Sequence, residues 1–571
     1  MPEEVFADEL SDGPPPFWRQ HAETLWAGAV FVLTLVMTVL AFPPFQTPEC
    51  AYFLAAPAAL WAYRRPGFWR FAGTVLGAQA VAWTLILGWL RHVTWGGMLL
   101  LGPFAGLWVG AWFLALWWTL PRLPGRAAPL RVLAILGLAG LWTVNEWGRT
   151  WLLGGFPWLP LAASQWQRAA ILQVAAYTGA GGVSFTLVAM NLGLAAYAHR
   201  LWFENKRGLW RRSPEFLTAL ALLLTCLGVH LGEAVNRAPY AVPLARVAFV
   251  QPAIPQEVKW DASKRDEILA VLDEVTRQAA ALKPGLILWP EATTPLPLNA
   301  EPELRSRVEK LGRDAGAPLV LGSIAILPGP DGRSETAEWL NAAFVVDPVA
   351  GMQERIYAKR KLVPFGEYVP LRPLFGWLGK FVPIGDDFGR GENATPLAVH
   401  LPGQPADSAL KAGTLICYED IFPALARASV QAGADVLVVH TNNAWYGEGG
   451  MAYQHAAHSV LRAVESRRPV LRDGNAGWSG WIDEFGIIRA VLTRDAAGNV
   501  NAGPAAPDAG PAASASVYFR GTAAADVTRD SRWIGRQSFY TEHGDWFVAA
   551  CAALATAAWL AVRRGAKPAC G

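Results

Sequence analysis

Long apolar stretches constrain the fold of this chain more than any other feature. They lie at Leu25–Phe42, Tyr52–Tyr63, Phe71–Leu90, Gly97–Leu120, Leu130–Trp147, Ala180–Ala198, Phe216–Leu231 and Trp546–Val562. An α-helix needs about 20 such residues to cross the hydrocarbon core of a bilayer, with a range of about 17–25. The stretch at 52–63 is short and would have to extend upstream. The pattern therefore predicts a multi-pass helical membrane bundle of about eight spans, seven before residue 240 and one near the C-terminus.

The composition supports this interpretation. The 571 residues include 28 Trp, and only 17% are charged, compared with about 25% in typical soluble domains. The 53% hydrophobic content excludes a disordered chain, and the net charge of +3 gives no electrostatic reason to expect nucleic-acid binding. Residues 1–24 lack the basic start of a signal peptide, so we expect the first apolar stretch to remain as a helix.

The basic residues between the apolar stretches predict the orientation. If the N-terminus is cytoplasmic, the loops on that side contain Arg64, Arg65, Arg70, Arg122, Arg126, Arg131, Arg200, Lys206, Arg207, Arg211, Arg212, Arg563, Arg564 and Lys567. The short loops on the other side contain only Arg91, Arg149 and Arg168. Positive charge is retained in the cytoplasm, so both termini are expected there and the segment from about 235 to 540 outside. Arg532 and Arg536 belong to this large translocated segment, where the rule is weak.

The segment after Gly232 has the pattern of a water-exposed α/β domain. Short β-rich runs occur at Arg246–Val250, Gly285–Trp289, Pro318–Ile326, Ala342–Val346, Gly413–Cys417, Asp435–His440 and Pro469–Arg472. Amphipathic helices are predicted at 261–282, with Asp261 as N-cap, and at 450–467. The uncharged stretch 496–515 is expected to be a flexible surface loop, followed by a β-like run at 516–519. Ligands of such domains bind at the carboxyl ends of the strands.

Two charged side chains follow such strands. Glu291 ends the run 286–290, where a carboxylate is either a hydrogen-bonded structural group or a general base whose pKa burial raises toward neutrality. Lys359 and Lys361 lie in a basic stretch, which would be unremarkable as a solvated surface, and that interpretation is preferred for Lys361. Lys359 is instead a candidate oxyanion donor, if its ammonium lies near a thiolate and a carboxylate.

Cys417 is the single cysteine of the external segment. A small buried apolar residue is the default interpretation of such a cysteine. Its place between a strand and a following helix favours a nucleophile, because a helix N-terminus lowers a thiol pKa from about 8.5 and supplies N–H donors to an oxyanion. A Cys–His pair with His440, His455 or His458 is a weaker alternative, and His455 with His458 lacks a further zinc ligand.

Glu146 and Arg149 lie three residues apart at the end of a predicted span. Charges there are costly unless paired or functional. Their spacing favours a structural ion pair, with contact to a lipid headgroup as the second choice.

Taken together, these segments and their order resemble the apolipoprotein N-acyltransferase family of the nitrilase superfamily, over nearly the whole chain. The shared motifs are Gln251, Lys259-Trp260, WPEAT (289–293), YAKRKLVPFGEYVP (357–370), ICYED (416–420), NNAWYG (442–447), Gln454-His455, Arg472, Asn475, Gly477, Trp142-x-x-x-Glu146-x-x-Arg149 and GFPW (155–158). The chain departs from the family where Asn443 replaces a frequent Asp and Lys361 a frequent His. These departures put only local loop contacts in doubt.

The resemblance implies a nitrilase-like four-layer α-β-β-α sandwich outside the cytoplasm, seated on a bundle of eight helices. It implies a membrane domain at 1–240, a catalytic domain at 241–538, and a C-terminal helix with a cytoplasmic tail at 539–571. The family's catalytic triad corresponds to Glu291, Lys359 and Cys417, the lysine being chosen by its spacing of eight residues from Glu367. Supporting or substrate-binding roles correspond to Trp260, Glu367, Tyr418 and Glu419.

The implied activity is an acyl transfer in the bacterial inner membrane, with the catalytic domain in the periplasm. Cys417 would take an acyl group from a membrane phospholipid as a thioester and pass it to the α-amino group of a diacylglyceryl-cysteine at an apolipoprotein N-terminus. No cofactor or metal is expected. A membrane-anchored nitrilase-type amidase, with water as the acceptor, is the alternative, and a catalytically inactive scaffold for lipoprotein handling is a second.

The orientation can be tested with tags. We expect a tag at residue 571 to be protected from an impermeant protease added outside the inner membrane, and a tag within 496–515 to be cleaved. The reason is the retention of the basic loops in the cytoplasm. The opposite accessibility would overturn the orientation.

Overall fold

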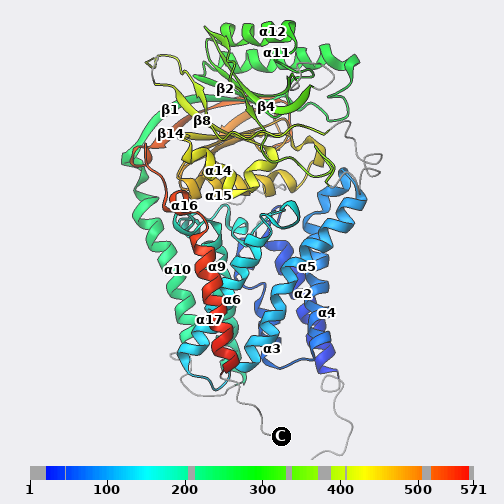
Figure 1. Cartoon of the computed structure of the whole chain (residues 1–571), viewed down its shortest axis with the longest axis vertical. Coiled ribbons are helices and arrows are strands. Elements are labelled where there is room, and N and C mark those ends of the chain that lie inside the picture. The colour runs from blue at the N-terminus through cyan, green and yellow to red at the C-terminus, as the bar shows by residue number, and fades with distance from the viewer. Residues whose placement is uncertain are drawn as a thin grey trace, which may run out of the picture.

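The computed structural model describes residues 21–45, 47–203, 213–328, 337–370, 387–405, 408–504 and 516–564. A helical bundle forms one end of the molecule and two β-sheets with their flanking helices form the other (Figure 1). Residue 571, most of the predicted loop 496–515, and the basic residues Lys206, Arg207, Arg211, Arg212 and Lys567 lie outside the described residues.

Six of the described segments are long and apolar enough to cross a membrane: Ala22–Ala41 (α2), Trp95–Arg122 (α5, Trp95–Thr119, and η3), Ala128–Gly148 (α6), Ala180–Phe203 (α9), Pro214–Tyr240 (α10, Pro214–Glu233, and η7, Val235–Tyr240) and Trp546–Arg564 (α17). They coincide with six of the eight predicted stretches. The chain thus has the helical bundle that its apolar stretches predict.

The other two predicted spans differ from these six. The stretch 71–90 forms α4 (Phe68–Ile86), which has 19 residues but contains Arg70 and Gln79, whose polarity lowers its mean hydropathy. The stretch 52–63 is divided between a 3₁₀ turn (Pro48–Tyr52) and α3 (Ala56–Tyr63). The eight residues of α3 extend about 12 Å, well short of a hydrocarbon core of about 30 Å. Apolar content alone did not distinguish a short helix from a full span.

Glycines let the bundle helices approach one another closely. A Cβ atom on Gly106 of α5 would lie 2.3 Å from the carbonyl oxygen of Gln79 and 2.6 Å from Cα of Ala80, both on α4. A Cβ on Gly140 of α6 would lie 2.8 Å from the carbonyl oxygen of Cys551 on α17. Small residues at such contacts are typical of helix packing in membranes, where van der Waals contact replaces the hydrophobic effect.

Two sheets of seven strands form the other end. The first has the order β14-β1-β2-β3-β4-β5, with β6 paired to β4, and the second β13-β12-β11-β10-β9-β8-β7. Strands β1–β3 run parallel to one another, as do β8–β10. The strands of the first sheet are β1 (Ala241–Gln251), β2 (Leu286–Trp289), β3 (Leu319–Leu327), β4 (Glu338–Asp347), β5 (Gly351–Met352), β6 (Tyr357–Ala358) and β14 (Gly521–Asp530). Those of the second are β7 (Leu397–Val399), β8 (Leu410–Ile416), β9 (Val436–Thr441), β10 (Val470–Gly474), β11 (Gly480–Ile482), β12 (Ile488–Arg494) and β13 (Val500–Gly503).

Each of the seven β-rich runs predicted between 246 and 472 lies in one of these strands or extends beyond it by one residue, but the C-terminal part of the prediction was wrong in two places. Residues 500–503, assigned to a flexible loop, form β13, and the run at 516–519 contributes only an isolated bridge from Ser516 to Arg494. The following strand is β14, which pairs along the whole of β1. Pairing with a distant strand, rather than local propensity, decided both positions.

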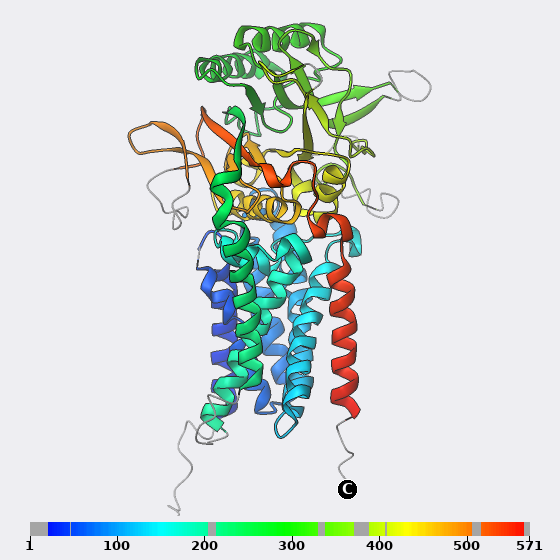
Figure 2. The same cartoon turned by 90° about the vertical axis from the view of Figure 1, so that its left-hand side faces the viewer.

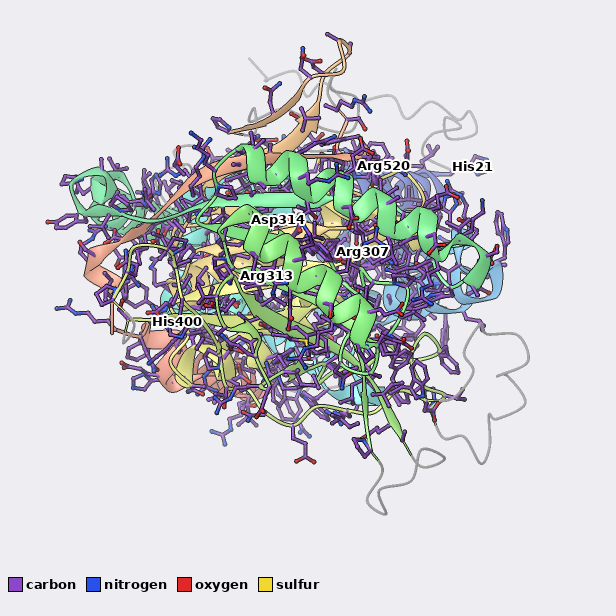
Figure 3. All side chains as sticks on the ribbon, turned by 90° about the horizontal axis from the view of Figure 1, so that it is seen from above. His21, Arg307, Arg313, Asp314, His400 and Arg520 are labelled. Carbon is purple, nitrogen blue, oxygen red and sulfur yellow. The ribbon has the colours of Figure 1, made fainter. Side chains whose placement is uncertain are left out.

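Alternating side chains pack the two sheets face to face. Val247 and Phe249 of β1 share one apolar core with Val436 and Val438 of β9. The intervening residues of each strand point to the opposite faces, because successive side chains alternate across a sheet. Ala248 and Val250 therefore pack with helices α11 (Arg265–Ala281) and α12 (Pro302–Ala315), which lie side by side over the first sheet (Figure 3). Leu437 and Val439 pack with α15 (Met451–Ser466).

Helices α14 (Pro423–Gln431) and α15 lie between the second sheet and the bundle (Figure 1). The layers are therefore helix, sheet, sheet and helix, in the order expected from the resemblance. The amphipathic interpretation of 450–467 was incomplete, because every residue of α15 is buried, polar ones included. Helix α10 runs along the bundle toward the sheets and leads through η7 into β1, so it connects the bundle to the first sheet (Figure 2).

The close contact at Gly106 predicts a stability change. We expect Gly106→Ala to lower the free energy of unfolding in detergent by roughly 1–3 kcal/mol, because the added methyl group meets backbone atoms of α4 that cannot rotate away. The measurement is the thermal unfolding midpoint. Gly73→Ala is the matched control, since a Cβ on Gly73 of α4 meets no atom within 4 Å. Equal midpoints for the two variants would contradict the packing described.

Candidate active site

The predicted triad residues meet between the two sheets. Glu291 follows β2 of the first sheet, Lys359 follows β6, and Cys417 follows β8 of the second. Lys359 Nζ lies 3.2 Å from Glu291 Oε1, and the Cys417 thiol is a hydrogen-bond partner of the Glu291 carboxylate. All three side chains are buried. Strands from opposite sheets thus bring a carboxylate, an ammonium and a thiol into one site.

A second carboxylate and an amide complete the cluster. Glu367 Oε1 lies 2.8 Å from Lys359 Nζ, so this ammonium is paired with two carboxylates. Asn341 of β4 donates from Nδ2 to Glu291 Oε1 at 2.8 Å and to Glu367 Oε1 at 3.0 Å. Glu367 was among the predicted supporting residues, whereas Asn341 was not. An Asn inside a strand carries no sequence signal for this role, because only the pairing of β4 with β6 places it beside Lys359.

The backbone of Cys417 turns sharply from β8 into the five-residue 3₁₀ helix Cys417–Ile421 (η11). Cys417 has φ +50°, a left-handed conformation that costs energy for a residue with a side chain. Thr441 Oγ1 lies 3.7 Å from Sγ, and the main-chain N–H of Asn442 also bonds the thiol. The Cys417 carbonyl accepts a hydrogen bond from His455 Nε2 at 3.1 Å. These contacts fix the buried thiol at the corner of a tight turn.

Glu419 holds this turn against the neighbouring chain. Its Oε2 accepts hydrogen bonds from the Ile416 N–H and the Tyr357 hydroxyl, both at 2.7 Å. Its Oε1 accepts from the N–H groups of Arg360 and Lys361 at 2.6 and 3.1 Å. The carboxylate therefore links the segment that carries Cys417 to the segment that carries Lys359, and its predicted supporting role is best described as a structural clamp.

Tyr418 and Trp260 lie at the edge of the cluster. The Tyr418 hydroxyl donates to the carbonyl oxygen of Gly155, in the connection that follows α6, at 3.0 Å. Lys361 Nζ donates to the neighbouring Gly154 oxygen at 2.6 Å, so this lysine, expected to be a solvated residue, contacts the membrane part. Trp260 is 52% exposed. Leu153, in the same connection, is 80% exposed. An apolar surface therefore adjoins the site.

The protonation states differ from those expected. Burial opposes the charge of Glu291, but Lys359, Asn341 and Lys259 outweigh it and hold the pKa of this carboxyl below its usual value. Burial and the Glu291 charge raise the pKa of the Cys417 thiol to about 12. Both directions contradict the expected raised carboxyl pKa and lowered thiol pKa. The resting site therefore contains a carboxylate and a neutral thiol, and the proton must move during the attack.

The histidines do not form a Cys–His pair. His455 Nε2 lies 2.9 Å from Asp420 Oδ1 and bonds the carbonyl of Cys417, not its sulfur. His440 Nδ1 bonds the Trp289 carbonyl at 2.8 Å, and burial lowers the His440 pKa to about 4. His458 Nε2 accepts from the Leu159 N–H. In the part of the chain that the structure describes, no cluster of three His, Cys, Asp or Glu side chains could hold a metal ion.

Glu146 and Arg149 act electrostatically on each other, but the structure shows no close ion pair between these two described residues, and each has another side-chain partner. Glu146 Oε1 accepts hydrogen bonds from Trp142 Nε1 at 2.8 Å and from the Leu161 N–H at 2.6 Å. The Arg149 guanidinium lies over the Trp83 ring, 5.1 Å from its centroid. The turn after α6 directs the two side chains to different partners, so their spacing of three residues did not decide the contact.

Comparison with known proteins relates both parts of the chain to described families. Residues 246–502 match the carbon-nitrogen hydrolase family, and residues 36–193 match the apolipoprotein N-acyltransferase N-terminal domain. The chain is 32% identical over 546 residues to an apolipoprotein N-acyltransferase of Geobacter metallireducens, covering 93% of this chain and 95% of that protein. It is 30% identical over 498 residues to one of Pseudomonas putida, covering 84% and 89%. A crystal structure of an amidase from Nesterenkonia sp. aligns with 51% of this chain and 92% of its own at 21% identity, with a TM-score of 0.34.

The clamp at Glu419 predicts a strong effect of a small change. We expect Glu419→Gln to lower the free energy of unfolding by roughly 1–3 kcal/mol, because the new amide N–H group faces buried donors instead of accepting from them. The unfolding midpoint and the rate of Cys417 alkylation measure the effect. Glu274→Gln, on the exposed side of α11, is the control. A Glu419→Gln protein as stable and as reactive as the control would show that the clamp is dispensable.

Proposed function

We propose a mechanism for this chain, which belongs to the apolipoprotein N-acyltransferase family and is an acyltransferase of lipoprotein maturation. In the proposal, Cys417 accepts an acyl group from a membrane phospholipid and passes it to the α-amino group of the diacylglyceryl-cysteine of an apolipoprotein. The observation that carries the proposal is the meeting of Glu291, Lys359 and Cys417 in a buried site, whose neighbour Tyr418 contacts the connection after α6 of the apolar bundle.

In the first half-reaction the Glu291 carboxylate takes the thiol proton while Sγ attacks the ester carbonyl carbon. A C–S bond forms and the carbonyl oxygen becomes an oxyanion, for which Lys359 and backbone N–H groups near Cys417 are the candidate donors. The C–O bond to glycerol then breaks, and the leaving oxygen takes the proton from Glu291. A lysophospholipid departs and a thioester remains on Cys417.

In the second half-reaction the α-amino group of the acceptor attacks the thioester carbon. The C–N bond forms, the C–S bond breaks, and Glu291 takes a proton from the attacking nitrogen and returns one to the departing sulfur. The products are an amide on the lipoprotein and the free thiol. Because Glu291 is ionised and the thiol neutral at rest, the site is ready for general-base catalysis in both steps.

The membrane bundle explains how both lipid substrates reach the thiol. Moving an acyl chain into water costs about 0.8 kcal/mol for each CH₂ group, so a site that opens sideways to the bilayer avoids this cost. The connection after α6 supports such an entrance, because its exposed Trp151 and Leu153 adjoin Gly155, which the Tyr418 hydroxyl contacts. Trp260 and this connection are the candidate walls of the substrate path.

For the bundle we propose eight crossings, with the catalytic domain periplasmic and both termini cytoplasmic. Support comes from the end of the bundle away from the sheets, where Arg65 bonds the Pro121 carbonyl, and Glu215 pairs with Arg131 and Arg200. These contacts bring three of the loops rich in basic residues to one end, as a cytoplasmic face requires. The chain between α2 and α4, with α3 as its helical part, would provide the second crossing.

The proposed division of the chain keeps a membrane domain at 1–240, a catalytic domain at 241–538 and a C-terminal helix with its tail at 539–571. The start of β1 at Ala241 and the start of α16 (Phe539–His543) support these boundaries. The alternative with water as the acceptor is not favoured, because an amidase needs neither a lipid nor a bundle of membrane helices.

Loss of the nucleophile tests the proposal directly. We expect Cys417→Ala to form no acyl adduct with phospholipid, and Glu291→Gln to form it roughly 10²–10⁴ times more slowly because the general base is lost. Intact-mass spectrometry measures the adduct, and a diacylated peptide serves as acceptor in a second assay. Cys226→Ala, a buried thiol of α10 far in sequence from the site, is the control.

An adduct that persists in Cys417→Ala at the parental rate would refute the assigned nucleophile. Amide hydrolysis without lipid, and no acylation of the peptide, would instead support the amidase alternative.

A further inference from the structure

A second lysine is buried beside the triad. Lys259 is 1% exposed, and its Nζ donates to the main-chain carbonyl oxygen of Glu291 at 3.2 Å. The carboxylate of Glu291 and the thiol of Cys417 are the two groups that act electrostatically on this ammonium. No carboxylate oxygen lies within 4.0 Å of Lys259 Nζ among the described residues, unlike Lys359. A buried ammonium without a direct counterion is costly and needs a compensating role.

The number of charged groups next to Cys417 indicates the role of Lys259. Asp420 pairs with Arg472, and Arg360 acts electrostatically on Glu419. Two carboxylates, Glu291 and Glu367, and two ammonium groups, Lys359 and Lys259, then remain next to Cys417. Lys359 is shared between both carboxylates, so without Lys259 the cluster would carry one net negative charge before any chemistry.

Catalysis adds a negative charge to the reacting atoms. When the thiol proton moves to Glu291 and sulfur attacks the ester, the charge of the carboxylate reappears on the oxyanion of the tetrahedral intermediate. With Lys259 protonated, the cluster remains neutral through this step. Without it, the oxyanion and Glu367 would share the single charge of Lys359, in a site where burial strengthens the repulsion between like charges.

We propose that Lys259 is an electrostatic and positioning residue of the acyl transfer, which fixes the main chain of Glu291 and balances the charge of the tetrahedral intermediate at Cys417. This inference rests on the proposed function, because it assigns the charge balance of that same reaction. The same role accounts for a buried lysine next to the half-exposed Trp260. The ammonium is 5.8 Å from the centroid of the Trp260 ring.

The inference has a pH signature. Burial, opposed in part by Glu291 and Cys417, lowers the pKa of Lys259 to about 8. The ammonium is therefore present below about pH 8 and lost above it. Three neighbouring groups titrate outside this range, because the pKa of Lys359 is raised, that of Cys417 is raised to about 12, and that of His440 is lowered to about 4. We expect the rate of thioester formation to fall above about pH 8.

Three substitutions separate charge from structure. Lys259→Gln retains an N–H donor for the Glu291 carbonyl but removes the charge, and Lys259→Met removes both. Lys264→Met is the matched control, because Lys264 lies in the same connection, is exposed, and forms its ion pair with Glu267 rather than with a group of the site. The readout is the rate of the acyl adduct on Cys417 with phosphatidylethanolamine vesicles and no acceptor peptide, from pH 6 to 10, so that the amine of the second half-reaction does not contribute.

We expect both Lys259 variants to form the adduct roughly 10–100 times more slowly than the parent near neutral pH, without the decline above pH 8. Lys264→Met should match the parent. Parental rates in Lys259→Gln, or a parent whose rate does not decline above pH 8, would overturn the charge-balancing role. The parental profile remains decisive even if a variant does not fold. A parent that forms no adduct at any pH would instead refute the proposed function itself.

Discussion

The sharing of one buried ammonium between two carboxylates is the interaction on which the catalytic part of this structure depends. Lys359 bridges Glu291 and Glu367 at 3.2 and 2.8 Å, and burying such charges is affordable only when each one has partners. Those partners come from β2, β4 and the segment after β6, and Cys417, the proposed nucleophile, comes from the other sheet. The site therefore forms only when the two sheets pack face to face in one relative position. The apolar core between the sheets fixes that position, and the charged cluster lies at the edge of this core.

Helix α15 connects this site to the membrane bundle. All of its residues are buried, because the helix is packed between the second sheet and the bundle. One residue shows how closely the two parts fit. The amide of Gln454 donates to the carbonyl oxygens of Pro43 and Ile86, and its Oε1 accepts from the indoles of Trp89 and Trp158. The next residue, His455, bonds the carbonyl of Cys417. A satisfied polar network of this kind fixes a unique geometry, which places the thiol at a defined height above the apolar helices that would carry its lipid substrates.

Much of the site was predictable because its residues follow strands. Glu291 and Cys417 each follow an apolar run, where the ligands of α/β domains bind, although the two strands belong to different sheets and only the packing of those sheets brings the side chains together. The protonation states were not predictable. Cys417 was expected to gain from a helix N-terminus, but η11 is a single short turn, and burial beside Glu291 raises the thiol pKa instead. The role of Asn341 was not predictable either, because it arises from the pairing of β4 with β6. The way Glu419 acts was not predictable because its partners Tyr357 and Arg360 lie about 60 residues away.

The sequence by itself determined that the chain is a membrane protein with an α/β domain, since hydropathy and the alternation of side chains are properties of neighbouring residues. It also indicated Glu291, Lys359 and Cys417, which the structure brings together, because their residue types and order are written in the chain. Only the tertiary structure decided which apolar stretch is a short helix, that Glu146 and Arg149 take separate partners, and how the charges around Cys417 are shared. Those outcomes depend on distances between segments remote in sequence and on how completely water is excluded from them, and neither quantity is a property of a local pattern.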